Sequence, residues 1–313
     1  MTPGKKPPLL VITGPTATGK TRLAALLGSQ FDGEIISADS RQVYRGMDIG
    51  SGKDQDDYVV DGMLVPYHLV DIVDPGYEYN VYEYQQDFFK AYNHILSRGK
   101  QPILCGGTGL YIEAVISGYR FSEVPVNDEL RMELSYLTMA ELTEKLTSIR
   151  PLHNTTDTAD RNRLVRAIEI AMHNQDSDTG SDDGLQSLDP ILFGISFERS
   201  ELRERISNRL KQRIEEGLTK EIELLLDKGL QPEQLTFYGL EYRYVTQYVT
   251  GEIRRDEMTR KLNTAIHQFA KRQMTWFRRM EKKGHKIHWI DGRLSSEEKI
   301  RQITEHIGWV GNN

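Results

Sequence analysis

The segment that most constrains the fold is a glycine-rich stretch near the start of the chain, which matches the pattern G-x4-G-K-[ST]. It reads Gly14-Pro15-Thr16-Ala17-Thr18-Gly19-Lys20-Thr21. Four consecutive apolar residues, Leu9 to Ile12, precede it, and leucines at helical spacing follow it between 20 and 29. An apolar run without alternation is typical of a strand buried on both faces of a parallel sheet. The sequence therefore predicts a strand, a phosphate-binding loop and a helix in that order, with a purely structural glycine turn as the alternative.

The residue types of this loop indicate the chemistry of its ligand. Glycines let successive backbone N–H groups turn toward phosphate oxygens at the start of a helix, where the helix dipole also favours an anion. Lys20 adds a positive charge, and the Thr21 hydroxyl can ligate Mg²⁺. We therefore expect a phosphate-binding site, of the kind that holds nucleotides, with Mg²⁺ as cofactor. On this motif alone, ATP-binding P-loop ATPases, GTPases and small-molecule kinases are the default.

Further apolar runs extend the same architecture along the chain. Strands are predicted at 34–37, 102–105 and 191–195, and the middle one leads into Gly106-Gly107-Thr108-Gly109 and a helix over 110–117. Residues 199–228 carry apolar residues every three to four positions, which predicts one long helix. This alternation predicts an α/β fold, a P-loop NTPase-like parallel sheet flanked by helices.

One part of the chain shows no strand pattern. At 313 residues the chain is long enough for about two domains. Residues 121–187 have a helical, strongly charged pattern, and a stretch rich in Asp, Ser and Gly at 174–190 predicts a flexible surface loop. We therefore expect a P-loop catalytic core made of 1–120 and 188–313, with the C-terminal helices, and a helical insertion domain at 121–187.

Charge and cysteine content exclude several classes of protein. The chain has 40 Lys and Arg against 46 Asp and Glu, and its net charge of −6 rules out nucleic-acid binding by bulk positive charge alone. Cys105, the single cysteine, excludes a disulfide framework and cysteine-based zinc fingers. The apolar run at the N-terminus is too short for a signal peptide, and no stretch approaches the roughly 18 apolar residues of a membrane span. We expect a cytoplasmic protein.

A carboxylate follows the second predicted strand. Asp39 lies just beyond residues 34–37, and the carboxyl ends of parallel strands meet at the edge where ligands bind in open α/β sheets. Asp39 could therefore be a ligand of Mg²⁺ or a general base that faces a bound phosphate compound. A structural role, with Asp39 or Ser40 as a helix N-cap, is compatible with either.

Positive charge is concentrated in one segment near the C-terminus. Between His267 and Lys286 the single acid Glu281 stands against seven cations: Lys271, Arg272, Arg278, Arg279, Lys282, Lys283 and Lys286. Trp276 and Phe277 are interleaved with them. Lysines and arginines bind phosphates by counterion release, and flat side chains stack on unpaired bases. The segment predicts an RNA-binding face, with a basic surface helix whose Trp276 packs inward as the alternative.

Six motifs occur in the order seen in one enzyme family. They are GPTATGKT, SADSRQVYRGMDIGSGK (37–53), HLVDIVDP (68–75), GGTGLY (106–111), DRNRLVRAIEI (160–170) and AKRQMTWFRR (270–279). In these motifs the chain resembles the tRNA dimethylallyltransferases, which are similar in fold to P-loop nucleotide kinases. The resemblance implies transfer of a dimethylallyl group from dimethylallyl diphosphate to N6 of adenosine 37 in tRNAs that read codons beginning with U. The implied partners are dimethylallyl diphosphate and the tRNA anticodon stem-loop, and we expect a monomer without membrane attachment.

The resemblance also assigns roles to individual residues. The loop from Gly14 to Thr21 would hold the diphosphate, and Lys20 would stabilise the charge that develops on this leaving group. Asp39 would accept the proton of N6, and Thr108 would bond the diphosphate near the breaking bond. The residues implied in tRNA binding are Asp39, Ser40, Arg41, Gln42, Thr108, Arg131, Arg163, Arg166, Lys271, Arg272, Gln273, Trp276 and Arg278. Thr108 could instead cap a helix, and Arg131 could be a solvated helix charge.

Two departures from the family pattern concern the RNA contacts. Where relatives commonly show GYKE or GYR, this chain has Gly239-Leu240-Glu241-Tyr242, and an arginine common before AKRQ is His267 here. Other functions stay open at this point. They are an isopentenyltransferase that uses a free adenine nucleotide, a small-molecule kinase, and a non-enzymatic RNA-binding module whose P-loop is unused.

Overall fold

A computed structural model describes residues 6–119, 124–149, 161–176 and 188–308. The chain divides into two compact units. One comprises Met1–Tyr119 and Leu188–Asn313, and the other comprises Arg120–Ser187. Within the described ranges, no helix combines the length and the apolar composition that crossing a membrane requires.

The larger unit is built on a six-stranded sheet in the order β5-β2-β6-β1-β7-β8, in which every pairing is parallel. The strands are β1 (Leu9–Thr13), β2 (Gly33–Ser37), β5 (Tyr67–His68), β6 (Gln101–Gly106), β7 (Pro190–Ser196) and β8 (Ile287–Asp291). Every residue of β1, β2 and β6 is buried, as the unalternating apolar runs predict. The α/β fold is thereby confirmed. Strands β5 and β8 extend the sheet beyond the predicted strands.

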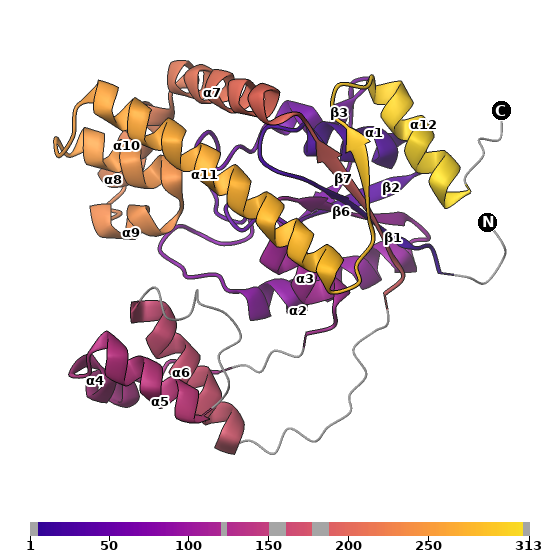
Figure 1. The fold of residues 1–313 in the computed structure, drawn as a ribbon. Helices are drawn as coiled ribbons and strands as arrows, with labels where there is room; N and C mark the ends of the chain where they lie inside the picture. Colours follow the sequence, from indigo (N-terminus) through magenta and orange to yellow (C-terminus); the bar gives the residue numbers. More distant parts are fainter. Residues whose placement is uncertain (1–5, 120–123, 150–160, 177–187, 309–313) are drawn as a thin grey trace. The chain divides into compact units, whose positions relative to one another are not determined.

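Helices cover both faces of this sheet (Figure 1). Alternate residues of β1 point to opposite cores, Leu10 and Ile12 to one and Leu9 and Val11 to the other. The first core includes side chains of α1 (Lys20–Gln30) and α12 (Ser296–Ile307). The second includes side chains of α2 (Val81–Ser97) and α3 (Gly109–Ile116), together with the C-terminal helices. A small antiparallel pair, β3 (Val59–Val60) with β4 (Met63–Leu64), follows the 3₁₀ helix η1 (Gln55–Tyr58).

The C-terminal helices are α7 (Arg199–Glu216), α8 (Leu218–Asp227), α9 (Pro232–Phe237), α10 (Leu240–Val249) and α11 (Arg255–Lys282). The prediction of one helix over 199–228 is wrong. Gly217, with φ 110°, separates α7 from α8. A left-handed glycine is the usual way to end a helix, and the apolar spacing continues on both sides of it.

The smaller unit contains α4 (Asp128–Ser135), α5 (Met139–Ile149) and α6 (Arg161–Asp176). Leucines at helical spacing form its own core, among them Leu134, Leu142, Leu146 and Leu164, each fully buried. The predicted loop at 174–190 lies mostly outside the described residues. At its two ends, α6 continues to Asp176 and β7 begins at Pro190.

Candidate active site

Three adjacent strands bring the predicted site residues to one edge of the sheet. β6 lies between β2 and β1, and all three run in parallel. Asp39 lies just beyond β2, Thr108 just beyond β6, and the loop 14–19 directly follows β1. Because parallel strands end at the same edge, the loop and both side chains share the position where open α/β sheets bind ligands.

The loop after β1 has the backbone of an anion-binding turn. Gly14 (φ 143°), Ala17 (φ 63°) and Gly19 (φ 78°) all adopt positive φ. A Cβ on Gly14 would lie 2.5 Å from the Ile195 carbonyl oxygen, so glycine is required at this position. Within the described chain, the N–H groups of residues 17 to 19 donate to no protein acceptor. These groups, at the N-terminus of α1, are free for phosphate oxygens.

Lys20 is half-buried in this loop. Its amine donates to the Pro15 carbonyl at 2.7 Å. Burial, together with the Arg209 charge, lowers its pKa to about 8, while Cys105 and the Asp39 carboxylate act in the opposite direction. A buried ammonium with a neutral carbonyl partner is stabilised when an anion binds beside it. The electrostatics of the loop therefore fit a negatively charged ligand.

The second glycine turn, residues 106–109, touches the Asp39 segment directly. A Cβ on Gly106 would lie 2.3 Å from the Ala38 carbonyl oxygen. Thr108 N donates to the same carbonyl at 3.1 Å, and the Thr108 hydroxyl accepts a hydrogen bond from Ser40 N, also at 3.1 Å. Although Thr108 occupies the N-cap position of α3, its side chain makes no capping hydrogen bond. The hydroxyl therefore lies between the two loops rather than on the helix end.

Asp39 begins a turn, not a helix. Its Oδ1 accepts a hydrogen bond from Arg41 N at 3.0 Å, and its side chain is partly exposed. No described group donates to its Oδ2. The side chain of Gln42, only three positions on, is buried and donates to the Gly52 carbonyl at 3.1 Å while accepting from Ser37. Of the two, Asp39 keeps an oxygen available for a ligand, and Gln42 is engaged inside the protein.

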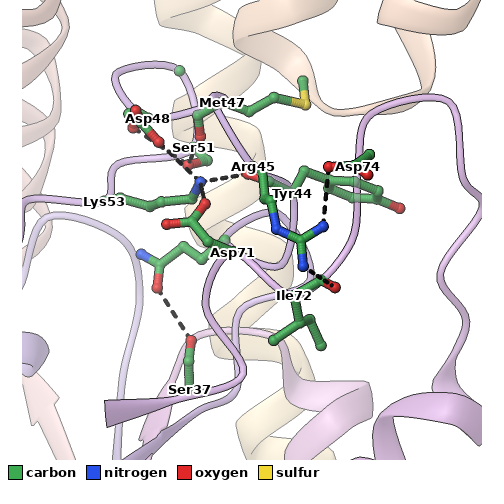
Figure 2. A network of polar contacts seen from close by, with 12 residues as sticks. Ser37, Tyr44, Arg45, Met47, Asp48, Ser51, Lys53, Asp71, Ile72 and Asp74 are labelled. Atoms are coloured by element: carbon green, nitrogen blue, oxygen red, sulfur yellow. Dashed lines mark hydrogen bonds and ion pairs between the residues drawn. The ribbon is translucent and has the colours of Figure 1, made fainter. Parts of the chain in front are cut away.

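Lys53 fixes the rest of this segment (Figure 2). Its side chain is 1% exposed, and its amine binds the Asp48 carboxylate at 2.9 Å together with the Tyr44 carbonyl and the Asp71 carboxylate. From α8, Glu221 accepts three further hydrogen bonds, from the N–H groups of residues 48, 49 and 50, at 2.7 to 3.0 Å. The motif SADSRQVYRGMDIGSGK is thus a rigid connection from Asp39 to α8.

Helix α11 packs on the second glycine turn. The Gln273 amide donates to the Gly107 carbonyl and accepts from Thr16 N, both at 2.9 Å. A Cβ on Gly109 would lie 2.3 Å from Cδ1 of Trp276, so the indole fills the space beside that glycine. Trp276 therefore packs inward, and Gln273 joins two loops. Lys271, Arg272 and Arg278 of the same helix are exposed.

Two cations of the basic segment bind an internal acid. Glu113 on α3 is fully buried and accepts from Arg279 at 2.9 Å and from Lys283 at 2.6 Å. Burial opposes ionisation of Glu113, but hydrogen bonds from Lys283, Tyr119 and Arg279 outweigh it and lower its pKa. These two cations therefore serve the fold, whereas the exposed ones remain for an external anion.

The unusual acid Glu241 has a partner of its own. The guanidinium of Arg213 on α7 lies 3.8 Å from it, and both side chains are largely buried. Burial raises the pKa of Glu241, and the Arg213 charge opposes that shift. Arg41, predicted to contact tRNA, lies over the exposed ring of Phe237 at 5.6 Å from the ring centroid.

In the smaller unit, two of the predicted tRNA-binding arginines form an internal cluster. Arg131 makes a two-pronged pair with Glu169, at 2.8 and 3.0 Å. Arg166 binds the same carboxylate at 3.0 Å and the Val124 carbonyl at 2.7 Å. The alternative that Arg131 is a merely solvated helix charge is therefore wrong. Arg163 is exposed on α6.

Sequence reasoning missed a row of arginines on α7. Arg205 donates to the Ala17 carbonyl at 3.0 Å, Arg209 pairs with Asp54 at 2.5 Å, and Arg213 is buried one turn further on. Their spacing of four residues on a predicted helix was the available signal, since it places all three on one face. They add positive charge beside the P-loop.

The donor groups at this edge fit a magnesium ion held jointly with phosphate. Among the described residues, no cluster of three His, Cys, Asp or Glu side chains could hold a metal ion by itself. Mg²⁺ usually keeps several waters and binds through one or two protein oxygens plus substrate phosphates. Thr21, in the first turn of α1, and the free oxygen of Asp39 supply oxygens of that kind.

These features define a P-loop α/β protein with an anion-binding loop and a carboxylate at one sheet edge. The sequence matches the family "IPP transferase" over residues 42–280 and the family "Isopentenyl transferase" over residues 7–62. The chain belongs to the IPP transferase family and is a prenyltransferase enzyme, which confirms the resemblance found in the motifs.

Relatives agree over nearly the whole length. The chain is 51% identical to tRNA dimethylallyltransferase 2 of Bacteroides fragilis over 299 residues, 96% of this chain and 97% of the relative. The crystal structure of the full-length tRNA isopentenylpyrophosphate transferase from Bacillus halodurans is similar with a TM-score of 0.70 and 33% identity, covering 97% and 96% of the two chains. A eukaryotic dimethylallyltransferase described as acting on tRNA shares the fold, with a TM-score of 0.76 at 22% identity over 96% of this chain and 79% of that one.

Proposed function

We propose that this enzyme transfers a dimethylallyl group from dimethylallyl diphosphate to N6 of adenosine 37 in tRNAs that read codons beginning with U. One observation carries the proposal. The loop after β1, with N–H groups free for an anion, shares a sheet edge with Asp39 and Thr108. The proposed reaction requires a diphosphate site beside a carboxylate able to take a proton, and this arrangement supports it.

The leaving group is the diphosphate, and the P-loop is suited to stabilise it. As the allylic C–O bond breaks, its electron pair goes to the diphosphate oxygen, and negative charge grows where the loop N–H groups and the Lys20 ammonium lie. The Thr108 hydroxyl, at the adjacent turn, can donate to the same oxygens. When bound, Mg²⁺ would supply further charge neutralisation there, with the Thr21 hydroxyl as its candidate protein ligand.

The nucleophile is the exocyclic amine of adenine. Its lone pair is delocalised into the ring, so removing its proton as the new N–C bond forms raises its reactivity. Asp39 is the group we assign to this step, since its Oδ2 has no partner in the described chain and its Oδ1 is fixed by Arg41 N. The proton of N6 ends on the Asp39 carboxylate.

The RNA reaches this edge with the target base out of its stack, because an adenine stacked in the anticodon loop cannot meet Asp39. The exposed cations of α11, namely Lys271, Arg272 and Arg278, are the phosphate contacts we propose, with Arg163 contributing from the smaller unit. Three further residues, Gln42, Arg131 and Arg166, support these contacts from inside the protein, because their side chains are engaged there. The Gln273 side chain is engaged between the two glycine loops instead. Because tRNA is the proposed substrate, we propose a cytoplasmic location. Because a single chain supplies every residue named, we propose a monomer.

The experiment is a choice between acceptors. Purified enzyme, Mg²⁺ and labelled dimethylallyl diphosphate are offered unmodified anticodon stem-loop RNA together with free AMP. We expect label on the RNA and none when adenosine 37 is replaced by guanosine. Label on AMP would assign the enzyme to free adenine nucleotides instead. Label on neither would refute prenyl transfer to adenine.

A further inference from the structure

We propose that Gln273 is a positioning residue, which holds the P-loop and the second glycine turn in the one register that lets both contact the same diphosphate. The proposal rests on the proposed function only in taking diphosphate as the ligand. Gln273 lies on α11, far from both loops in sequence, and its side chain is buried with 7% exposure.

The geometry is a two-point connection through one planar amide. Oε1 accepts from Thr16 N at 2.9 Å, and Nε2 donates to the Gly107 carbonyl at 2.9 Å. A Cβ on Gly107 would lie 2.5 Å from that same Nε2, so the absence of a side chain at 107 is what admits the amide. The amide of Gln273 therefore fixes the spacing between the two backbone segments.

Glutamine supplies the chemistry that this position needs. One partner is an N–H and the other a carbonyl, so the side chain must offer an acceptor and a donor side by side. An ionised glutamate offers two acceptors and would set a negative oxygen against the Gly107 carbonyl. Methionine has a similar volume but no strong hydrogen-bonding group. Methionine therefore leaves both Thr16 N and the Gly107 carbonyl without this partner, and ionised glutamate leaves the Gly107 carbonyl without a donor.

The consequence concerns the ligand-binding groups next to the amide. Thr16 directly precedes the N–H groups of residues 17 to 19, which are free for phosphate oxygens, and Gly107 directly precedes Thr108. A shift between the two segments would move the Thr108 hydroxyl away from the oxygens that the P-loop binds. Gln273 is thus required for diphosphate affinity and turnover, and it makes no contact with RNA.

The test uses Gln273→Met and Gln273→Glu, with Gln268→Ala as the matched control. Gln268 is an exposed glutamine of the same helix. Calorimetry measures binding of inorganic diphosphate with Mg²⁺, and a separate titration measures binding of anticodon stem-loop RNA. We expect Gln273→Met to weaken diphosphate binding about tenfold or more, the loss expected for two buried hydrogen bonds, with RNA affinity within about twofold of wild type. Gln268→Ala should change neither.

The pH profile of Gln273→Glu separates positioning from mere filling of space. A protonated carboxyl presents one donor and one acceptor, as the amide does. The diphosphate affinity of Gln273→Glu, divided by that of the wild type at the same pH, should therefore increase as the pH falls from 7.5 to 5. The charges of Lys20 and Asp39 at the neighbouring turns, like the titration of the ligand, are common to both proteins and cancel in the ratio.

Wild-type affinity in Gln273→Met, or a pH-independent ratio for Gln273→Glu, would overturn the proposal. If wild-type enzyme itself fails to bind diphosphate, the proposed function fails instead. Amide hydrogen exchange across residues 14–21 then still tests Gln273. Faster exchange in Gln273→Met than in Gln268→Ala supports the positioning role, and equal exchange refutes it. Should Gln273→Met not fold, Gln273→Glu at pH 5 and 7.5 gives the same comparison.

Discussion

Asp39 and Lys20 reach the same sheet edge from different strands, and their charges interact there. Lys20 is a half-buried amine with one carbonyl partner, and Asp39 is a carboxylate with one oxygen engaged in its own turn. Each therefore retains capacity for a ligand. By contrast, the side chains of Gln42 and Gln273 are satisfied within the protein. At the residue scale, catalysis is concentrated in few groups.

Replacing Asp39 by asparagine should separate chemistry from binding. The amide oxygen can still accept from Arg41 N, so the turn is kept, but the amide cannot take the proton of N6. We expect turnover to fall by about 10²-fold or more, as for loss of a general base, with RNA affinity within a few fold of wild type. Single-turnover kinetics and a binding titration measure the two. Unchanged turnover would remove Asp39 from the mechanism.

The pKa of Lys20, lowered by burial to about 8, predicts the pH dependence of diphosphate binding. In the free enzyme the amine loses its charge above about pH 8, whereas bound diphosphate favours the charged form. Affinity should therefore fall above pH 8, by up to about tenfold per pH unit. Lys20→Arg stays charged throughout, so the wild-type affinity divided by that of Lys20→Arg should decrease over pH 8 to 10. A constant ratio would contradict the prediction.

At the scale of elements, α11 has two different sides. Its buried side carries Gln273 and Trp276 against the second glycine turn, and its exposed side carries Lys271, Arg272 and Arg278. The helix thus links the phosphate-binding loops to a positively charged surface. The basic residues of α11 and Lys283 just after it are not equivalent, because Arg279 and Lys283 bind the buried Glu113.

Arg278→Ala should therefore weaken RNA binding without affecting the fold. Loss of one phosphate contact is expected to reduce the slope of log affinity against log salt by about one. Arg301→Ala, an exposed arginine of α12 on the opposite face of the sheet, is the control and should leave the slope unchanged. RNA titrations at several salt concentrations measure both. A slope equal to that of wild type would place Arg278 off the interface.

Within the smaller unit, the Glu169 cluster predicts a stability effect. Burial opposes ionisation of Glu169, but hydrogen bonds from Arg131 and Arg166 outweigh it and lower its pKa. Glu169→Gln removes that charge and should reduce the stability of this unit by about 1–3 kcal/mol. Glu144→Gln, an exposed glutamate of α5, is the matched control. Hydrogen exchange in α4 and α6 should accelerate in the first variant alone; no difference between the two would contradict the role of the cluster.

For the whole molecule, the sequence predicted what is encoded locally. β1, β2, β6 and β7 follow from apolar runs, and the P-loop from its own residues, because each signal lies within a few positions. β5 has two residues and β8 contains His288 and Trp289, so neither gives such a run. The partners of Gln273 lie 257 and 166 positions away, which no local pattern reports. Glu241 stands where the family pattern has a cation, and only its ion pair with Arg213 on another helix explains this difference.

The most direct test of the central claim is to locate the transferred group. Wild-type enzyme is given Mg²⁺, dimethylallyl diphosphate and an unmodified substrate tRNA, and the product RNA is digested and analysed by mass spectrometry as fragments and as nucleosides. We predict one dimethylallyl group, on N6 of adenosine 37, with one diphosphate released per group transferred. A group at another position or atom, or an unmodified RNA, would contradict the account.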